Sequence, residues 1–292
     1  MKAITRAITL AACMCAWPLS AATEEVDVMR LDRLLKLAHR NPEEALPTDR
    51  IYMKNRIIYC TGTSQLAIAN NRAAEKMERG DFSAAVEEIQ NSLKHASLFF
   101  PFRYNLGVCY LHLNMLKESL INFQKAQAVV PEYPETYIQM GTIYQRWYRD
   151  QEAIECYREA LRRNRNDLNT YVLIGNLFFN RNQVQLAKKY YDQCLRIDHR
   201  FNNGLLGRAK IHYKEGEYHK ALVVLKAINL RAEYDISYHY YYAECSFKLQ
   251  DYESAAVHYQ KLLEYRNDPF FLTNAVSLIE HKLALSKKFV EK

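Results

Sequence analysis

Small and large side chains alternate along this chain in a pattern that returns every 34 residues. Small residues hold one register in the first of two helices: Ala73, Gly107, Gly141, Gly175, Ala209 and Ala243. They hold a second register in the following helix: Ala85, Ser119, Ala153, Ala187, Ala221 and Ala255. A third register is large and apolar or aromatic: Ile89, Phe123, Tyr157, Tyr191, Leu225 and Tyr259. Three columns with one period predict six tandem structural units.

The columns indicate pairs of closely crossing helices. Helix backbones approach where side chains are small, and a large residue four positions after a small one, as Tyr157 follows Ala153, lies on the same helical face. We therefore predict six helical hairpins, at 66–99, 100–133, 134–167, 168–201, 202–235 and 236–269.

The turn inside each hairpin has its own register. Four turns carry a residue that tolerates the left-handed backbone ending a helix, namely Gly80, Asn114, Asn182 and Gly216. Tyr148 and Gln250 hold this register in the other two units, so we expect those two turns to be made differently.

The units resemble a known repeat family. The series Leu106-Gly107…Tyr110…Ser119…Phe123…Ala126…Pro131 is similar to the tetratricopeptide repeat signature, as is Gly141…Tyr144…Ala153…Tyr157…Ala160. The resemblance covers about residues 66–269. It implies an all-α, right-handed superhelical solenoid of helix-turn-helix units, whose concave groove is lined mainly by the first helices.

Solenoids need covered ends. We predict an N-terminal helical cap at 23–65, with one helix through Val28 and Ala38 that stops near Asn41-Pro42. A second helix is expected from Thr48 or Asp49 to about Tyr59. At the other end, we predict a C-terminal capping helix at 270–292 from a helical apolar stripe: Leu272, Val276, Ile279 and Leu283.

Residues 1–22 are typical of a signal peptide. Lys2 and Arg6 precede an uncharged run of about eleven residues, too short for a bilayer, which needs ~20. Ser20-Ala21-Ala22 offers a cleavage site before Thr23. The alternative is lipidation at Cys13, because Leu10-Ala11-Ala12-Cys13 resembles the bacterial lipobox. We expect an exported protein of the periplasm or envelope, with a lipid anchor left open.

Composition narrows the class of partner. Hydrophobic residues make up 49% and charged residues 25% of the chain, as in folded proteins. The net charge is +7 with acidic residues interspersed, so nucleic acid is not an expected partner. The cysteines beyond the leader form no C-x-x-C pair and are interpreted as core thiols, with one disulfide left open: Cys60, Cys109, Cys156, Cys194 and Cys245.

Catalytic motifs for phosphate, zinc or nucleophilic chemistry are absent from the sequence, and we predict a non-enzymatic protein without cofactor or metal. His212 and His219 are seven residues apart, but a turn at Gly216 separates them, and we interpret both imidazoles as packed or solvated.

Helical spacing from the small residues predicts the side chains that line the groove. Many are aromatic, as at binding hot spots. They are Tyr104, Val108 and Leu111; Ile138, Thr142 and Gln145; Val172, Asn176 and Phe179; Leu206, Lys210 and Tyr213; and Tyr240, Glu244 and Phe247.

These residues favour an apolar partner segment, either extended or an amphipathic helix. The Lys–Asn clamp by which some family members grip a terminal carboxylate is not expected, because the lysine is missing at the matching positions of the second to fourth units. The leading hypothesis is an envelope adaptor that binds a protein segment. The alternative is an accessory protein of a solute transporter that holds a small apolar molecule. Self-association stays open, and membrane contact is expected only through a lipid anchor.

Overall fold

The computed structural model describes residues 51–94, 98–228, 236–266 and 273–291. They divide into two compact units, an N-terminal unit ending at Arg165 and a C-terminal unit beginning at Asn166. The predicted leader, Cys13 and the first predicted N-terminal helix lie outside the described residues.

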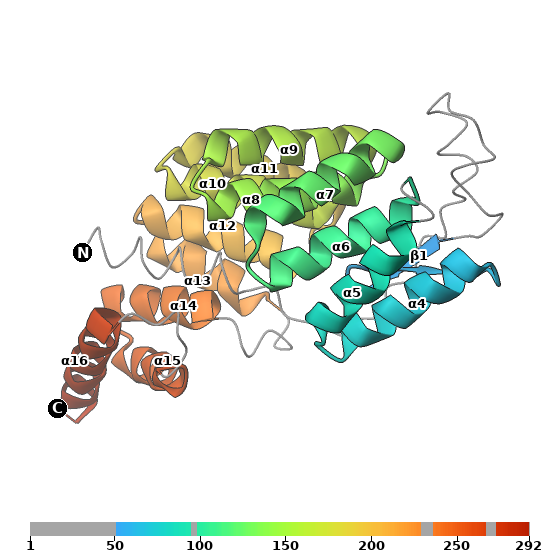
Figure 1. Ribbon diagram of the computed structural model, residues 1–292. Helices are drawn as coiled ribbons and strands as arrows, with labels where there is room; N and C mark the ends of the chain where they lie inside the picture. Colours follow the sequence, from blue (N-terminus) through green and yellow to red (C-terminus); the bar gives the residue numbers. More distant parts are fainter. Residues whose placement is uncertain (1–50, 95–97, 229–235, 267–272, 292) are drawn as a thin grey trace. The chain divides into compact units, whose positions relative to one another are not determined.

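The described residues of the N-terminal unit form three helical hairpins (Figure 1). They are α4 (Gln65–Glu78) with α5 (Phe82–Leu93), α6 (Phe100–His112) with α7 (Leu116–Val129), and α8 (Pro134–Arg146) with α9 (Asp150–Arg163).

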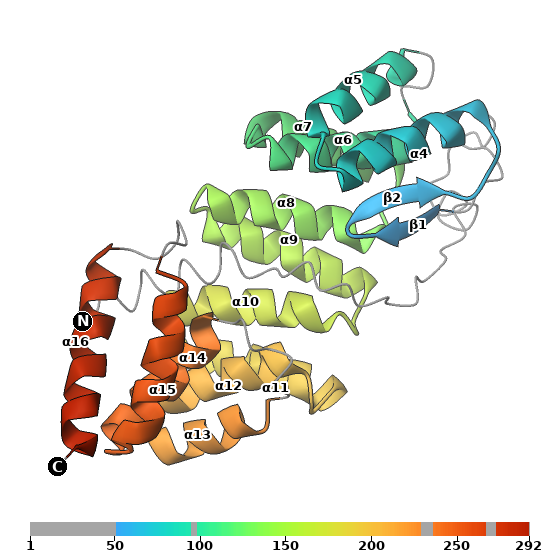
Figure 2. The ribbon, with the colours of Figure 1, turned by 90° about the horizontal axis from the view of Figure 1, so that it is seen from below.

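In the C-terminal unit, the part of the chain that the structure describes forms three more hairpins and a final helix that packs on α15 (Figure 2). They are α10 (Leu168–Asn180) with α11 (Val184–Ile197), α12 (Asn202–Lys214) with α13 (Tyr218–Lys226), α14 (Ile236–Lys248) with α15 (Tyr252–Glu264), and α16 (Thr273–Val290). The six helical hairpins predicted from the 34-residue period are confirmed.

The three sequence columns form the core of the hairpins. Every residue of the second and third columns is fully buried, at 0% exposure. A Cβ added to Gly141 would lie 2.5 Å from Tyr157 Cε1, and one on Gly175 would lie 2.5 Å from Tyr191 Cε1. The small residue of the first helix is therefore the place where the aromatic ring of the second helix packs.

All six hairpin turns share one backbone geometry, so the prediction of two different turns was wrong. Tyr148 (φ 58°) and Gln250 (φ 63°) are left-handed, like Gly80 and Gly216 (both φ 81°). In the third unit, Tyr148 N donates to Gln145 O at 3.0 Å, and the next amide donates to Tyr144 O at 2.9 Å. This pair of bonds closes the helix in the Schellman manner. Hairpin packing imposes the turn even on residues that disfavour it.

A β-hairpin precedes the first helix, where a second N-terminal helix was expected. Strands β1 (Ile51–Lys54) and β2 (Ile57–Cys60) pair antiparallel, with Ile51 opposite Cys60. The two residues between the strands, Asn55 and Arg56, are both left-handed, at φ 50° and 63°. Two such residues make the turn that matches the twist of paired strands.

The predicted C-terminal helix is present as α16. Its Ile279 and Leu283 are buried, at 2% and 8% exposure, in one cluster with Tyr259 and Leu262 of α15. The apolar stripe therefore covers the last hairpin. None of the described helices is long and apolar enough to cross a membrane.

Candidate protein-binding surface

In the N-terminal unit, the chain's own β2 strand lies against the first helices α4 and α6. Asn105 of α6 forms two hydrogen bonds with the backbone of Ile58. Its Oδ1 accepts from Ile58 N at 2.8 Å, and its Nδ2 donates to Ile58 O at 2.7 Å. Asn71 of α4 does the same to Cys60, at 2.8 and 2.7 Å. Asparagine side chains thus satisfy backbone groups of a strand whose other edge pairs with β1.

The three groove candidates on α6 are packed within the protein. Tyr104, Val108 and Leu111 are 0%, 3% and 8% exposed. The Tyr104 ring meets the rings of Phe123 and Tyr133 edge-on, at centroid distances of 5.4 and 5.7 Å. Burial raises the pKa of the Tyr104 phenol. These side chains offer little surface to a partner.

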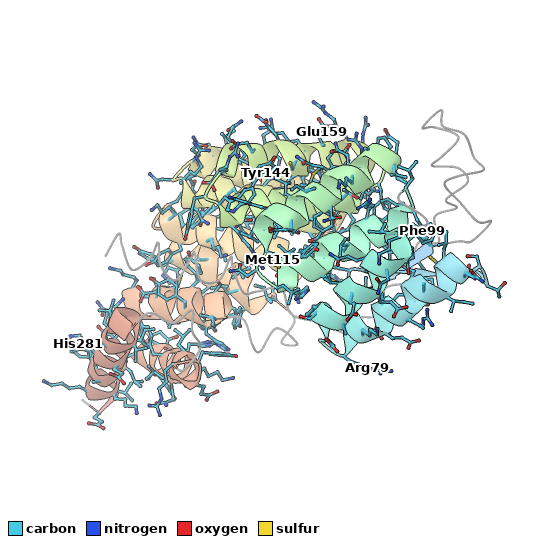
Figure 3. The ribbon with its side chains drawn as sticks, viewed as in Figure 1. Arg79, Phe99, Met115, Tyr144, Glu159 and His281 are labelled. Carbon is cyan, nitrogen blue, oxygen red and sulfur yellow. The ribbon has the colours of Figure 1, made fainter. Side chains whose placement is uncertain are left out.

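On α8, the candidates are tied to the buried ring of the same hairpin. Ile138 is buried, whereas Thr142 and Gln145 are partly exposed. The Tyr157 hydroxyl donates to Gln145 Oε1 at 3.1 Å and lies 3.5 Å from Thr142 Oγ1. The third-column tyrosine therefore reaches across the hairpin to the surface of the first helix. Figure 3 shows Tyr144, from the same helix, among the side chains of this unit.

The same link recurs in the C-terminal unit. The Tyr191 hydroxyl donates to Asn176 Oδ1 at 2.7 Å. The Tyr259 hydroxyl donates to Glu244 Oε1 at 2.8 Å. We call the side of α10, α12 and α14 that carries Asn176, Lys210 and Glu244 the first-helix face; α12 packs against both of the other helices.

Glu244 is held by its surroundings. Tyr213 donates to Glu244 Oε2 at 3.2 Å, and Lys282 of α16 forms an ion pair with Oε1. Lys282 Nζ also lies 5.7 Å from the centroid of the Phe247 ring. The candidates Glu244, Tyr213 and Phe247 thus belong to one network that connects the last hairpin to the C-terminal helix.

Asn176 and Lys210 differ from Glu244 because their side-chain nitrogens, Nδ2 and Nζ, donate no hydrogen bond to the described residues. Tyr191 engages only the oxygen of the Asn176 amide, and Nδ2 has no bond within the described residues. Lys210 is 5% exposed, and its Nζ lies 5.8 Å from the Tyr241 ring centroid, a cation–π distance. No carboxylate among the described residues forms an ion pair with Lys210. The first-helix face therefore presents a buried cation and an amide donor on neighbouring helices.

The remaining candidates in this unit are largely buried. Val172 and Phe179 are each 9% exposed, Leu206 is 6% and Tyr240 is 7%. They come from the same three helices as Asn176, Lys210 and Glu244, and like the α6 candidates they expose little area. Sequence spacing placed these side chains on one face, but it did not reveal how much of each is buried.

The cysteines that the structure describes are thiols rather than disulfides. Burial raises the pKa of Cys109, Cys194 and Cys245 to about 12 in each case. A thiol with so high a pKa is a poor nucleophile or metal ligand at neutral pH, so these cysteines are packing residues.

Models of known protein families match most of the repeat region of this chain. Two family models described as tetratricopeptide repeat match residues 70–134 and, in two copies, 134–167 and 168–199. A model of the anaphase-promoting complex, cyclosome, subunit 3, matches residues 199–262.

Curated relatives are distant. The TPR repeat-containing protein YpiA of Bacillus subtilis is 21% identical over 195 residues, which are 64% of this chain and 46% of the relative. The CTR9 homolog of Arabidopsis thaliana is 31% identical over 114 residues, 37% of this chain and 10% of the relative. The chain thus spans less than half the length of either protein.

Solved structures show the same fold at low identity. A tetratricopeptide repeat protein from Parabacteroides merdae gives a TM-score of 0.61 at 17% identity, covering 77% of this chain and 87% of that one. PilW, a type IV pilus biogenesis factor, gives 0.60 at 16% identity, covering 74% and 100%.

Hairpins of fixed length, a shared left-handed turn and a small-to-aromatic crossing define a helical-repeat protein. The family models and the fold identify the same family of helical repeats: the chain is a tetratricopeptide repeat protein. Proteins with these repeats are general scaffolds for protein interactions.

Proposed function

We propose that the protein is a non-catalytic adaptor of the bacterial cell envelope, and that it binds a segment of a partner protein on the first-helix face of its C-terminal unit. The family supports the adaptor role. The observation that carries the choice of surface is the pairing of Lys210 and Asn176 at one register of α12 and α10, with donors that the described residues leave unused.

Burial of an ammonium group without a carboxylate partner is unfavourable in free energy, because the charge loses its hydration. A hydrogen-bond acceptor from a partner would offset this loss through a charge-assisted hydrogen bond. The Tyr191 hydroxyl fixes the orientation of the Asn176 amide before any partner arrives, which lowers the entropy lost on binding. Val172 and Leu206 lie one helical turn before Asn176 and Lys210, and the small area that they expose is apolar. The partner segment that we propose carries an acidic side chain or exposed carbonyl directed at Lys210.

The N-terminal unit is the poorer candidate for this role. Its first helices α4 and α6 already bind β2 of the same chain through Asn71 and Asn105. The transporter-accessory alternative receives no support from the comparisons.

The envelope setting rests on the leader at residues 1–22. Cleavage after Ala22 would give a soluble exported protein that begins at Thr23, and lipidation would give one that begins at Cys13. The mass of the mature protein isolated from its host separates the two. A chain that retains Met1 or Lys2 and stays in the cytosol would contradict the export proposal.

Site-specific photocrosslinking in the host tests the surface. A photoreactive amino acid at Asn176 should give an adduct of one constant mass, because the partner segment contacts this helix. The matched control is Lys189, an exposed residue of α11 in the same unit, which should give none. Equal adducts at both positions, or adducts at neither, would contradict the proposal.

A further inference from the structure

The turn between α12 and α13 gathers three potential metal ligands. One donor atom each from His212, Glu215 and Glu217 lies within 4.8 Å of the other two. His212 is partly buried, with a side chain 16% exposed, and its Nδ1 lies 2.7 Å from Glu217 Oε2. Glu215 is exposed. None of these groups belongs to the first-helix face.

The hairpin turn itself creates this proximity. Gly216 is left-handed, and Glu217 N donates to His212 O at 2.9 Å, which folds the two residues together. In the third hairpin, the equivalent turn positions are occupied by side chains of other types: Tyr144, Trp147 and Arg149. There, Tyr144 meets Trp147 edge-on at 6.1 Å, and the Arg149 guanidinium lies 5.1 Å from the Tyr144 centroid.

Side chains at these three positions therefore meet in both turns, and only the fifth hairpin fills all three with metal-binding types. The corresponding trios elsewhere are Lys76, Arg79 and Asp81; Tyr110, Leu113 and Met115; Phe178, Arg181 and Gln183; and Ser246, Leu249 and Asp251.

Glu217 is also used differently from its counterparts. Asp81 and Asp251 begin the second helix of their hairpins as side-chain caps, accepting from Ala84 N and Ser254 N at 3.1 Å. Glu217 makes no such cap. Its Oε1 accepts from Lys220 Nζ at 2.7 Å, and its Oε2 faces His212.

We propose that His212, Glu215 and Glu217 bind a divalent transition-metal ion of the zinc class. Imidazole nitrogen and carboxylate oxygen are ordinary zinc ligands, at about 2.0–2.2 Å from the metal. Three protein ligands leave a fourth position for water. Lys220 keeps its bond to the Glu217 oxygen that does not face His212.

Binding requires a small change at the turn. Ligand atoms around a tetrahedral zinc ion of this bond length lie about 3.3 Å apart, so Nδ1 of His212 and Oε2 of Glu217 must separate by roughly half an ångström.

The test is a calorimetric titration of ZnCl₂ into the full chain without an affinity tag. His212→Ala and Glu217→Gln should each lower the affinity for zinc by ~10-fold or more. Loss of a group that only supports a metal ligand already has an effect of this size, and loss of a ligand itself should have at least as large an effect. The matched control is His219→Ala, because His219 is exposed on α13 beside the site and should leave affinity unchanged. Wild-type affinity in His212→Ala, or equal loss in His219→Ala, would overturn the proposal.

A second measurement separates ligation from folding. Zinc should raise the melting temperature of the wild type and of His219→Ala, because a ligand bound only to the folded state stabilises it. It should leave His212→Ala unshifted, while circular dichroism without metal shows the same helicity in all three. A zinc-induced shift of the His212 imidazole ¹⁵N resonances would mark the ligand directly; unshifted resonances at saturating zinc would contradict its role.

Discussion

The hydroxyl of Tyr191 crosses its hairpin to donate a 2.7 Å hydrogen bond to Asn176, fifteen residues earlier in the chain. This pairing follows a rule. Wherever the third column holds tyrosine, the residue fifteen positions earlier carries an acceptor, as in Thr142, Asn176 and Glu244. Wherever it holds another residue, that position is Ala74, Val108 or Lys210. The third-column residue and its partner position on the first helix are therefore specified together.

Replacing Tyr191 with Phe tests this link. The ring stays, but Asn176 Oδ1 loses a donor at the edge of a fully buried aromatic. We expect a loss of about 1 kcal/mol in unfolding free energy, as for an ordinary intramolecular hydrogen bond. Urea denaturation measures it. The control is Tyr171→Phe, on a partly exposed ring of α10 in the same hairpin, and equal losses in both would contradict the link.

Replacing Tyr148 with Gly should stabilise the protein. Tyr148 is left-handed and 73% exposed, so the change relieves backbone strain and removes little packing. A left-handed backbone strains a non-glycine residue by ~1–2 kcal/mol, and the entropic cost of glycine offsets part of the relief. We therefore expect the free energy of unfolding to rise by about 0.5–1 kcal/mol. Trp147→Gly, at the preceding position with a negative φ of −86°, should instead destabilise. A lower melting temperature for the Tyr148 variant would show that the turn is not strained.

Replacing Asn105 with Ala should release the β-hairpin. Ile58 N then loses its buried acceptor, and Ile58 O keeps only the donor Asn70. We expect a loss of ~1–3 kcal/mol, together with faster tryptic cleavage at Lys54. The exposed Asn91→Ala in α5 serves as control and should change neither quantity. Unchanged cleavage in the Asn105 variant would mean that the hairpin is held by other contacts.

Acid should destabilise the C-terminal unit through a histidine pair. His258 Nδ1 lies 2.8 Å from His239 Nδ1, and burial, followed by the charge of His239 and Lys261, lowers the pKa of His258 to about 4. Unfolded His258 takes up its proton near pH 6.5, but the folded form does so only near pH 4. Stability therefore falls as pH drops through this window.

The measurement is the urea midpoint between pH 7 and pH 4.5. His258→Gln should flatten the dependence relative to the wild type, because it removes the group whose proton binding differs between the two states. His219→Gln, at an exposed site, should keep the wild-type slope. A slope in His258→Gln as steep as in the wild type would exclude the pair as its source.

The repeat fold was predictable because its columns are local and periodic: Gly141 and Tyr157 meet inside one hairpin, sixteen residues apart. The turn at Tyr148 was not, because intrinsic preference argued against a left-handed tyrosine and packing overrode it. The β-hairpin was missed for a different reason. Its strands have four residues each, and Asn105, the residue that holds β2, lies 47 positions from Ile58.

The candidate site was predictable only in part. Helical spacing put Tyr104 and Lys210 on the same kind of face, but one is packed against aromatic rings and the other keeps an unpaired charge. That difference depends on side chains from neighbouring elements, such as Tyr133 and Tyr241. The trio at His212 needed the turn geometry, because the sequence analysis compared His212 only with His219, and its proximity to Glu215 and Glu217 depends on the left-handed turn at Gly216.

The most direct test of the binding surface is the affinity of the purified chain for the segment that crosslinks at Asn176. Calorimetry should show that Lys210→Ala weakens binding about tenfold or more, since a charge-assisted bond at a buried site contributes roughly 1.5–3 kcal/mol. Lys189→Ala, which removes an exposed lysine from α11, should bind like the wild type. Equal affinity for all three chains would place the partner elsewhere on the molecule.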